Sequence, residues 1–340
     1  MDAPSSDVLG RTFAEFADAA SARPHDRARL RRRYRALFAD AEIDPDAAIA
    51  PAPVVRHVVD GDLIKFVQRT ADGLESESVI IPMGGGGRRW YTLCVSSQVG
   101  CARGCVFCET ARMGLLRNLS AAEIVGQVVA ARRRFAADVR NVVFMGMGEP
   151  LDNFDAVVQA LRVMNDDAGL SIARGRITVS TVGRCDGIRR LAALEWRRLN
   201  LAVSLNAPND EIRSRIMPIN RAEPMAALRE ALRAWAPRRA AAIMIEYVLI
   251  PGVNDRPDHA MQLADFLRGI RSCVNVIPYN PIPDSPWPAP EESSVTAFLS
   301  ALEGRGQFCK RRLTKGRAFM AGCGQLGNRA LRRAAPVRAG

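Results

Sequence analysis

No run of about 18 uninterrupted apolar residues occurs in this chain of 340 residues, so a membrane-spanning helix is not expected. The chain also starts without the apolar segment and cleavage site of a secretory signal, which favours the cytoplasm, where structural disulfides are rare. Histidine is scarce, with 3 residues in all, and this leaves few nitrogen ligands for a zinc site. The 8 cysteines therefore need a role other than structural disulfides.

Three of the cysteines lie in one short loop, Cys101-Ala-Arg-Gly-Cys105-Val-Phe-Cys108. This spacing supplies three thiolates to a four-iron cluster, which normally takes four. One iron then keeps an open position where a small molecule can coordinate, as in catalytic metal sites. A CxxxCxxC loop is typical of radical S-adenosylmethionine (SAM) enzymes, in which the open iron binds SAM and delivers the electron that splits it to a 5′-deoxyadenosyl radical. We therefore predict one [4Fe–4S] cluster per chain, held by Cys101, Cys105 and Cys108.

A zinc site is the alternative for the same loop. Zinc usually needs a fourth cysteine or histidine nearby, and His25, His57 and His259 all lie far from the loop in sequence. The loop and its context therefore favour the cluster.

Basic residues outnumber acidic ones, with 48 Lys and Arg against 36 Asp and Glu, and the net charge is +12. This surplus suits a partner that carries phosphates, such as RNA, because neutralising phosphates releases counterions. Six arginines fall in one predicted helix near the N-terminus, although a solvated helix face explains them nearly as well. Two further basic groups lie before and after Cys323 in the sequence. The three groups are Arg27, Arg29, Arg31, Arg32, Arg33 and Arg35; Lys310, Arg311, Arg312, Lys315 and Arg317; and Arg329, Arg332 and Arg333.

The length allows one large domain with a smaller attachment. Residues 7–48 are expected to be helical, and Leu63–Gln68 and Glu77–Pro82 are expected to form two strands joined by a turn at Asp72-Gly73. The predicted division is an N-terminal helical accessory domain that contacts RNA (1–52), a β-hairpin and linker (53–88), a catalytic domain (89–326) and a basic C-terminal tail (327–340).

From Trp90 onward, short apolar segments rich in β-branched residues alternate with helical ones. The alternation predicts right-handed βαβ units and a parallel sheet. Six repeats without a dinucleotide-binding glycine fingerprint favour an α/β fold, a partial (β/α)6 barrel of TIM type. The cysteine loop follows the first strand directly, at the edge where such barrels place their chemistry. The predicted strands are Tyr91–Val95, Asn141–Met145, Arg176–Ser180, Asn200–Leu205, Ile243–Ile250 and Cys273–Ile277, and the predicted helices include Ala121–Arg134, Phe154–Met164, Ala226–Trp235 and Asp258–Leu267.

Polar residues at the ends of the predicted strands are candidates for SAM binding. In Met145-Gly-Met-Gly-Glu-Pro150, Gly148 lets the backbone approach a ligand and Glu149 can accept hydrogen bonds from the SAM ammonium group. Ser180, Ser204 and Asn206 suit a ribose or a carboxylate. Asn280, in Pro278-Tyr-Asn-Pro281, is placed to reach the adenine.

Several sequence blocks resemble the RlmN/Cfr family of adenosine methyltransferases, from about Glu77 to Leu326. Val99-Gly100 and Cys323-Gly-Gln-Leu326 look more like RlmN than Cfr. The resemblance implies methylation of carbon 2 of an adenosine in 23S rRNA, with tRNA open as a second substrate, by a monomer that takes electrons from a donor such as flavodoxin. The other matching blocks are Cys94-Val-Ser-Ser-Gln-Val-Gly-Cys101, Arg117-Asn-Leu119, Gly146-Met-Gly-Glu-Pro150, Ala207-Pro-Asn-Asp-Glu211 and Pro278-Tyr-Asn-Pro281.

Carbon 2 of adenine lies between two ring nitrogens and is too electron-poor to attack the SAM methyl group. The resemblance implies a route through protein sulfur, in which Cys323 first takes a methyl group from one SAM. The radical from a second SAM then removes a hydrogen from the S-methyl group, and the resulting carbon radical adds to the adenine. Removal of the ring proton by Glu77, and attack of the Cys94 thiolate on the Cys323 sulfur, would release methylated RNA and leave a disulfide bond.

Each of these three residues also has a simpler interpretation. A solvent-facing strand glutamate explains Glu77 equally well, Cys94 by itself fits a buried strand cysteine, and Cys323 fits a loop thiol. The cysteines that match no motif and are expected to be structural are Cys185, Cys273 and Cys309.

Two positions depart from the family pattern. Asn206 stands where the family has histidine, and the segment from Lys315 to Gly322 lacks the family's aspartate. These departures leave open a divergent radical SAM enzyme acting on another RNA. The further alternatives to an RlmN-type enzyme are a Cfr-type enzyme that methylates carbon 8 and confers antibiotic resistance, a radical SAM enzyme acting on a protein, and a basic RNA-binding module with a structural metal.

Overall fold

The structure, a computed structural model, describes residues 8–20, 26–38, 51–85, 88–235, 242–312 and 320–331. The chain forms two compact units. Unit 1 consists of Met1–Val99, Arg117–Met147 and Asn153–Ile177, and unit 2 of Gly100–Leu116, Gly148–Asp152 and Thr178–Gly340. The predicted helical segment beyond residue 38, together with Lys315, Arg317, Arg332 and Arg333, lies outside the described residues.

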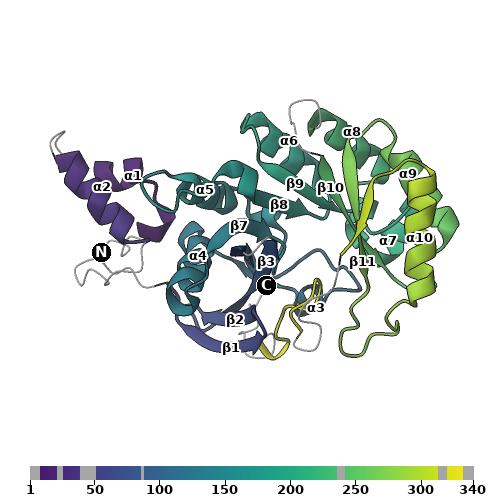
Figure 1. Cartoon of the computed structure of the whole chain (residues 1–340), viewed down its shortest axis with the longest axis horizontal. Helices are drawn as coiled ribbons and strands as arrows, with labels where there is room; N and C mark the ends of the chain where they lie inside the picture. The colour runs from purple at the N-terminus through teal and green to yellow at the C-terminus, as the bar shows by residue number, and fades with distance from the viewer. Residues whose placement is uncertain are drawn as a thin grey trace, which may run out of the picture. The chain divides into compact units, whose positions relative to one another are not determined.

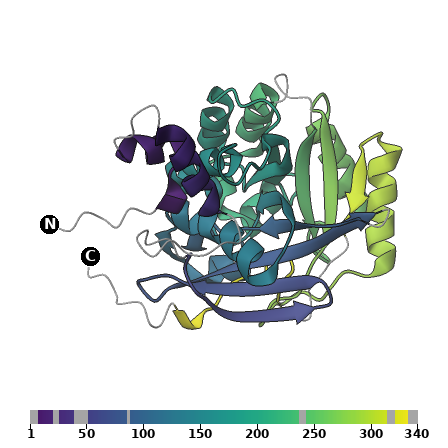
Figure 2. The same cartoon turned by 60° about the vertical axis from the view of Figure 1, so that its left-hand side comes forward.

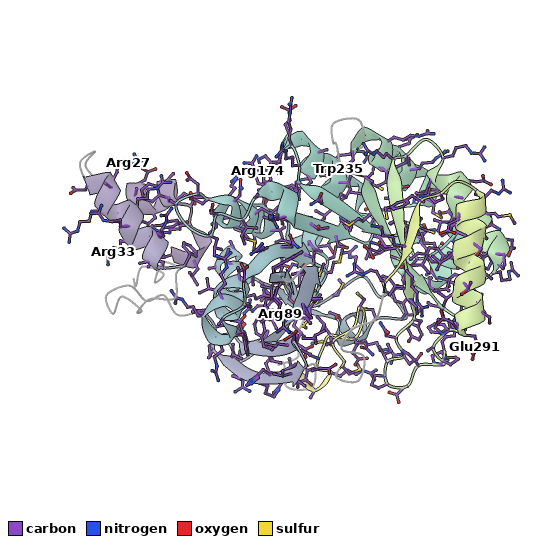
Figure 3. The ribbon with its side chains drawn as sticks, viewed as in Figure 1. Arg27, Arg33, Arg89, Arg174, Trp235 and Glu291 are labelled. Atoms are coloured by element: carbon purple, nitrogen blue, oxygen red, sulfur yellow. The ribbon has the colours of Figure 1, made fainter. Side chains whose placement is uncertain are left out.

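The N-terminal part of unit 1 contains the predicted helices. A short 3-10 helix (η1, Val8–Gly10) precedes α1 (Phe13–Ala19), which begins at a capping box between Thr12 and Glu15, and α2 (Arg27–Ala36) follows. Tyr34 is fully buried, and its ring lies against three phenylalanine rings at centroid distances of 5.0–5.7 Å. All six arginines of α2 are exposed, and Figure 3 labels Arg27 and Arg33 among them.

A set of antiparallel strands follows in unit 1: β1 (Val54–Asp60), β2 (Leu63–Arg69), β3 (Glu75–Gly85) and β4 (Arg88–Cys94). Figure 2 shows β1 and β2 as long neighbouring ribbons. β4 then pairs in parallel with β7 (Val139–Phe144). Unit 1 also holds α4 (Ala121–Phe135) and α5 (Phe154–Asn165), and α4 begins at the predicted capping box between Ser120 and Glu123.

Unit 2 is built on parallel strands in chain order, namely β8 (Ile177–Thr181), β9 (Asn200–Ser204), β10 (Ile243–Leu249), β11 (Ser272–Pro278) and β12 (Cys309–Arg311). The helices of this unit are α3 (Glu109–Met113), α6 (Cys185–Ala193), α7 (Asp210–Ile216), α8 (Met225–Trp235), α9 (Pro257–Leu267) and α10 (Glu292–Gly304). Helices α6 and α8 pack together, as do α9 and α10 (Figure 1).

The six strands predicted for the barrel are all present, as β4, β7, β8, β9, β10 and β11, and the four helices predicted with them are present, as α4, α5, α8 and α9, with bounds that differ by one residue. The sequence did not indicate β1, whose residues are half-buried or exposed and so lack an apolar alternation. Within the described ranges, none of the helices combines the length and apolar character that crossing a bilayer requires.

Candidate active site

The cluster loop, residues 101–108, lies in unit 2 between β5 (Gln98–Gly100) and α3. Its start requires glycine at position 100, because the backbone is left-handed there (φ 77°) and a Cβ would lie 1.8 Å from the carbonyl oxygen of Gly114. In the middle of the loop, the N–H of Val106 donates to the carbonyl of Ile216 at 3.1 Å. The loop is therefore anchored against the end of α7.

Burial makes the cluster cysteines poor acids when no metal is bound. Cys101 and Cys105 are buried, and Cys108 is half-buried. Desolvation raises the pKa of Cys101 to about 12 and raises the pKa of Cys105 well above its usual value. The negative charges of Cys108 and Glu149 raise both pKa values as well. Metal binding at this loop must therefore release protons.

The three thiols on one anchored loop fit the ligand set of a [4Fe–4S] cluster, in which each thiolate binds a different iron. Among the described residues, no group of three or more His, Cys, Asp or Glu side chains is arranged to hold a metal ion. The cysteine positions therefore decide neither for the cluster nor for zinc, and the cluster stays a prediction from the loop. Each of the eight cysteines, all within the described residues, is a free thiol, so a Cys94–Cys323 disulfide is not present.

Glu149 lies on a loop of the same unit, next to the left-handed Gly148 (φ 98°). Its carboxylate accepts hydrogen bonds from the backbone N–H groups of Val182 at 2.8 Å and Leu151 at 3.0 Å. Burial disfavours the charge more strongly than these donors favour it, and it raises the pKa of Glu149 to about 7. A carboxylate in this position suits the amino group of SAM.

The raised pKa predicts a pH dependence of SAM binding. Below its pKa of about 7, Glu149 is protonated and neutral, and above this value it is the carboxylate that pairs with the SAM amino group. We expect the affinity of the reconstituted enzyme for SAM to rise about tenfold between about pH 6 and about pH 8. Equilibrium dialysis with labelled SAM measures this, and Glu149→Gln serves as the control, with weak binding that does not vary with pH. A flat profile in the unmodified enzyme would contradict the assigned role of Glu149.

Ser180 lies near the end of β8, Ser204 ends β9, and Asn206 follows β9, where it has a structural role. Its backbone is left-handed (φ 56°), a conformation that asparagine tolerates better than most residues. Its side-chain oxygen accepts the N–H of Val248 at 2.9 Å, and its side-chain nitrogen lies 3.4 Å from the sulfur of Met217. Asn206 therefore holds the end of β9 against β10, and contact with SAM stays a prediction. Ser180 is buried and Ser204 is half-buried at the ends of their strands.

Asn280 has the clearest sign of a missing partner. The residue is buried, and its Oδ1 atom is among the buried oxygens that have no hydrogen-bond donor within the described part of the chain. A buried amide oxygen without a donor costs free energy unless a ligand satisfies it. The exocyclic amine of adenine is a suitable donor, which supports the predicted role.

The turn that carries Cys323 is hydrogen-bonded to the start of α3, directly after the cluster loop. The N–H of Glu109, the residue after Cys108, donates to the carbonyl of Gly324 at 2.7 Å, and the hydroxyl of Thr110 donates to the carbonyl of Leu326 at 2.5 Å. Glu109 also forms an ion pair with Arg329. These contacts fix the exposed Cys323 beside the predicted cluster.

Gln325 ties the same turn to the segment of Asn280. Its Nε2 donates to the carbonyl of Pro281 at 3.2 Å, and its Oε1 accepts the N–H of Gly322 at 3.0 Å. A Cβ at Gly322 would lie 3.0 Å from Nδ2 of Asn280. Unit 2 therefore brings together the cluster loop, Cys323 and the predicted adenine contact.

Cys94 and Glu77 lie in unit 1, on neighbouring strands. Cys94 on β4 pairs with Val79 on β3, and Glu77 is two residues from Val79, so both side chains share one face of the sheet. Both are buried, with 7% of Cys94 and 5% of Glu77 exposed. The interpretation of Glu77 as a solvent-facing glutamate is therefore wrong.

Two features of unit 2 were not found from the sequence. Arg103, inside the cluster loop, forms an ion pair with Asp152 at 2.6 Å, and Asp152 also binds Arg184 at 2.9 Å. The fully buried Arg213 donates from Nη1 to Oδ1 of Asn220 at 2.8 Å. The position of Arg103 within the cysteine motif was an available signal, whereas nothing in the sequence indicated that Arg213 is buried.

Comparisons with known proteins identify the family of this chain. The model of the Radical SAM superfamily matches residues 95–264. A protein of Protochlamydia amoebophila named probable dual-specificity RNA methyltransferase RlmN 1 is 47% identical over 84% of this chain and 78% of its own length. The dual-specificity RNA methyltransferase RlmN of Wolinella succinogenes is 43% identical over 84% of this chain and 83% of its own length.

Among solved structures, a radical SAM methyltransferase from Sphaerobacter thermophilus matches with a TM-score of 0.86 and 38% identity. The match covers 93% of this chain and 98% of that one. The predicted fold class is confirmed by this likeness.

Proposed function

The chain belongs to the RlmN family of radical SAM RNA methyltransferases, and from this premise we propose that it methylates carbon 2 of an adenosine in 23S rRNA, with tRNA as a second substrate. The observation that carries the proposal is the attachment of the Cys323 turn to the residues directly after Cys108. A thiol fixed beside the predicted cluster suits a methyl carrier. The relatives' description as dual-specificity enzymes supports the second substrate.

Two cofactors are proposed, one [4Fe–4S] cluster on Cys101, Cys105 and Cys108, and SAM at two equivalents per turnover. When bound, they would supply a carbon-centred radical able to remove one hydrogen atom from an S-methyl group, and the oxidised cluster would serve as acceptor for the one electron that the RNA adduct loses. Glu149 and Asn280 hold SAM by its amino group and its adenine. Gly148, Ser180, Ser204 and Asn206 are assigned to the walls of the same pocket.

The chain's own residues carry the methyl group. Cys323 attacks the methyl of SAM and becomes methylcysteine, and after the loss of one hydrogen atom its carbon bonds to the adenine ring. Glu77 then takes the proton from ring carbon 2. The thiolate of Cys94 attacks the sulfur of Cys323, and the sulfur–carbon bond breaks with its electron pair going to the methylene carbon. That carbon takes a proton from solvent, and the methylated RNA leaves while the two cysteines form a disulfide.

RNA is the proposed partner of the basic surface. The exposed arginines of α2 provide positive charge for phosphates, and residues 1–52 are proposed as an RNA-contacting domain apart from the catalytic residues 89–326. Residues 53–88 and 327–340 are proposed as a β-hairpin segment and a basic tail. A flavodoxin-type donor and a monomeric state complete the proposal.

Analysis of the nucleosides in enzyme-treated RNA tests the proposal. Anaerobically reconstituted enzyme, SAM and a reductant are incubated with 23S rRNA and with tRNA from a strain without its own carbon 2 methyltransferase. Mass spectrometry against standards should find 2-methyladenosine. Finding 8-methyladenosine would assign the Cfr-type reaction instead, and finding no methylated adenosine would contradict the proposal.

A further inference from the structure

Lys65 and Glu77 form an enclosed ion pair inside unit 1. The ammonium nitrogen of Lys65 lies 2.8 Å from Oε2 of Glu77, and the two side chains are only 12% and 6% exposed. The ion pairs of Glu75, two residues earlier on β3, are more exposed to solvent. The partners of Glu75 are Arg56 and Arg69, whose side chains are 52% and 50% exposed. Lys65 is thus a largely buried cation that forms an ion pair with the proposed base.

Strand register explains how the pair forms. Lys65 on β2 is opposite Val79 on β3, and Val79 is opposite Cys94 on β4. Opposite residues of antiparallel strands share a face, and alternate residues along a strand share it too. Lys65, Glu77 and Cys94 therefore lie on one face of the same three strands.

The opposite face of β3 contacts α4 through an uncharged side-chain hydrogen bond. Ser78 lies between Glu77 and Val79 and therefore points to the other face, where its hydroxyl donates to Oε1 of Gln127 on α4 at 2.7 Å. The charged and titratable side chains on the face of Glu77 include Lys65, the thiol of Cys94, and Glu75, which pairs with Arg56 and Arg69.

A buried carboxyl group is costly to ionise without a cation. Removal from water disfavours the charged form, whereas an opposite charge within about 4 Å favours it. A glutamate that must take a proton has to be ionised beforehand and held in one orientation. The Lys65 ammonium meets both needs, because it neutralises the carboxylate and holds one of its oxygens.

We infer that Lys65 is a positioning residue that keeps Glu77 ionised and oriented for removal of the ring proton. The inference rests on the proposed role of Glu77. In the step concerned, the carbon 2–hydrogen bond of the RNA adduct breaks, its electron pair stays in the ring, and an O–H bond forms on Glu77. Lys65 keeps its three protons throughout and acts through Glu77 alone.

The test uses single-turnover reactions of the full chain with Cys323 already methylated. Three products are measured at several pH values: 5′-deoxyadenosine, the covalent protein–RNA adduct and methylated RNA. Lys65→Met is expected to form 5′-deoxyadenosine at the normal rate but to resolve the adduct about tenfold more slowly or worse near neutral pH.

Lys65→Arg and Arg69→Met are the matched controls. Arg keeps the cation and should restore most of the rate of adduct resolution. Arg69→Met removes an ion pair from the same hairpin and should leave the adduct's lifetime unchanged, so that loss of stability alone does not imitate the effect. Lys65→Gln, which is neutral and closer in shape, replaces Lys65→Met where thermal melting shows that Lys65→Met is not folded.

Glu77→Gln separates this inference from the proposed function. If the Glu77→Gln adduct resolves at the unmodified rate, Glu77 is not the base and the proposed mechanism fails. If Glu77→Gln stalls at the adduct while the neutral Lys65 variant resolves it normally at every pH, the inference about Lys65 alone is overturned.

Discussion

Cys323→Ala is expected to lower RNA methylation by about a thousandfold or more, while 5′-deoxyadenosine still forms. The alanine variant has no sulfur to accept the methyl group from SAM. The cluster cysteines and Glu149 are unchanged, so reductive cleavage of SAM does not depend on position 323. Product nucleosides and 5′-deoxyadenosine are quantified in the same reaction, which separates the loss of methyl transfer from the loss of radical formation.

Cys273→Ala is the matched control for this variant. Cys273 is half-buried on β11 in the same unit, and it belongs to none of the motifs. Its replacement should leave both products at the unmodified level. Substantial methylation by Cys323→Ala would show that the methyl group does not pass through this sulfur.

Cys94→Ala is expected to stop the reaction after the RNA has become bonded to the protein. The sulfur–carbon bond between Cys323 and the methylene group is stable until a second thiolate attacks the sulfur. Without Cys94, denaturing gels should show a species in which protein and RNA migrate together, and released methylated RNA should fall by about a thousandfold.

Formation of the protein–RNA adduct in the Cys94→Ala variant is expected to require Cys323. The double variant Cys94→Ala with Cys323→Ala should give no protein–RNA species, because no methyl carrier is present. If the single Cys94→Ala variant releases methylated RNA at the unmodified rate, Cys94 is not part of the mechanism.

The sequence predicted the parts of this protein that depend on local patterns. Short β-branched runs predicted all six barrel strands, and Ser120 with Glu123 predicted the start of α4, since a capping box needs only four neighbouring residues. The cysteine spacing likewise predicted one short loop. In each case the signal and the structure span the same few residues.

Features that depend on long-range register were beyond the sequence. The ion pair of Lys65 with Glu77 follows from the alignment of β2 with β3, which no short sequence pattern specifies. The burial of Glu77 depends on the same alignment. The contact of Thr110 with Leu326 joins residues 216 positions apart.

Asn206 shows a third kind of limit. In the sequence it is a departure from a family motif, whereas in the structure its left-handed backbone and its bond to Val248 give asparagine a reason to be there.

The central claim is that the methyl group is carried and taken apart on a protein sulfur before it reaches RNA. The most direct measurement uses SAM with a fully deuterated methyl group and determines the isotope content of the methyladenosine by mass spectrometry. One deuterium should leave as a hydrogen atom and be replaced by a proton from solvent, so the account predicts a product methyl group with two deuteriums and one hydrogen. A product methyl group that retains all three deuteriums would show direct transfer from SAM and would contradict the account.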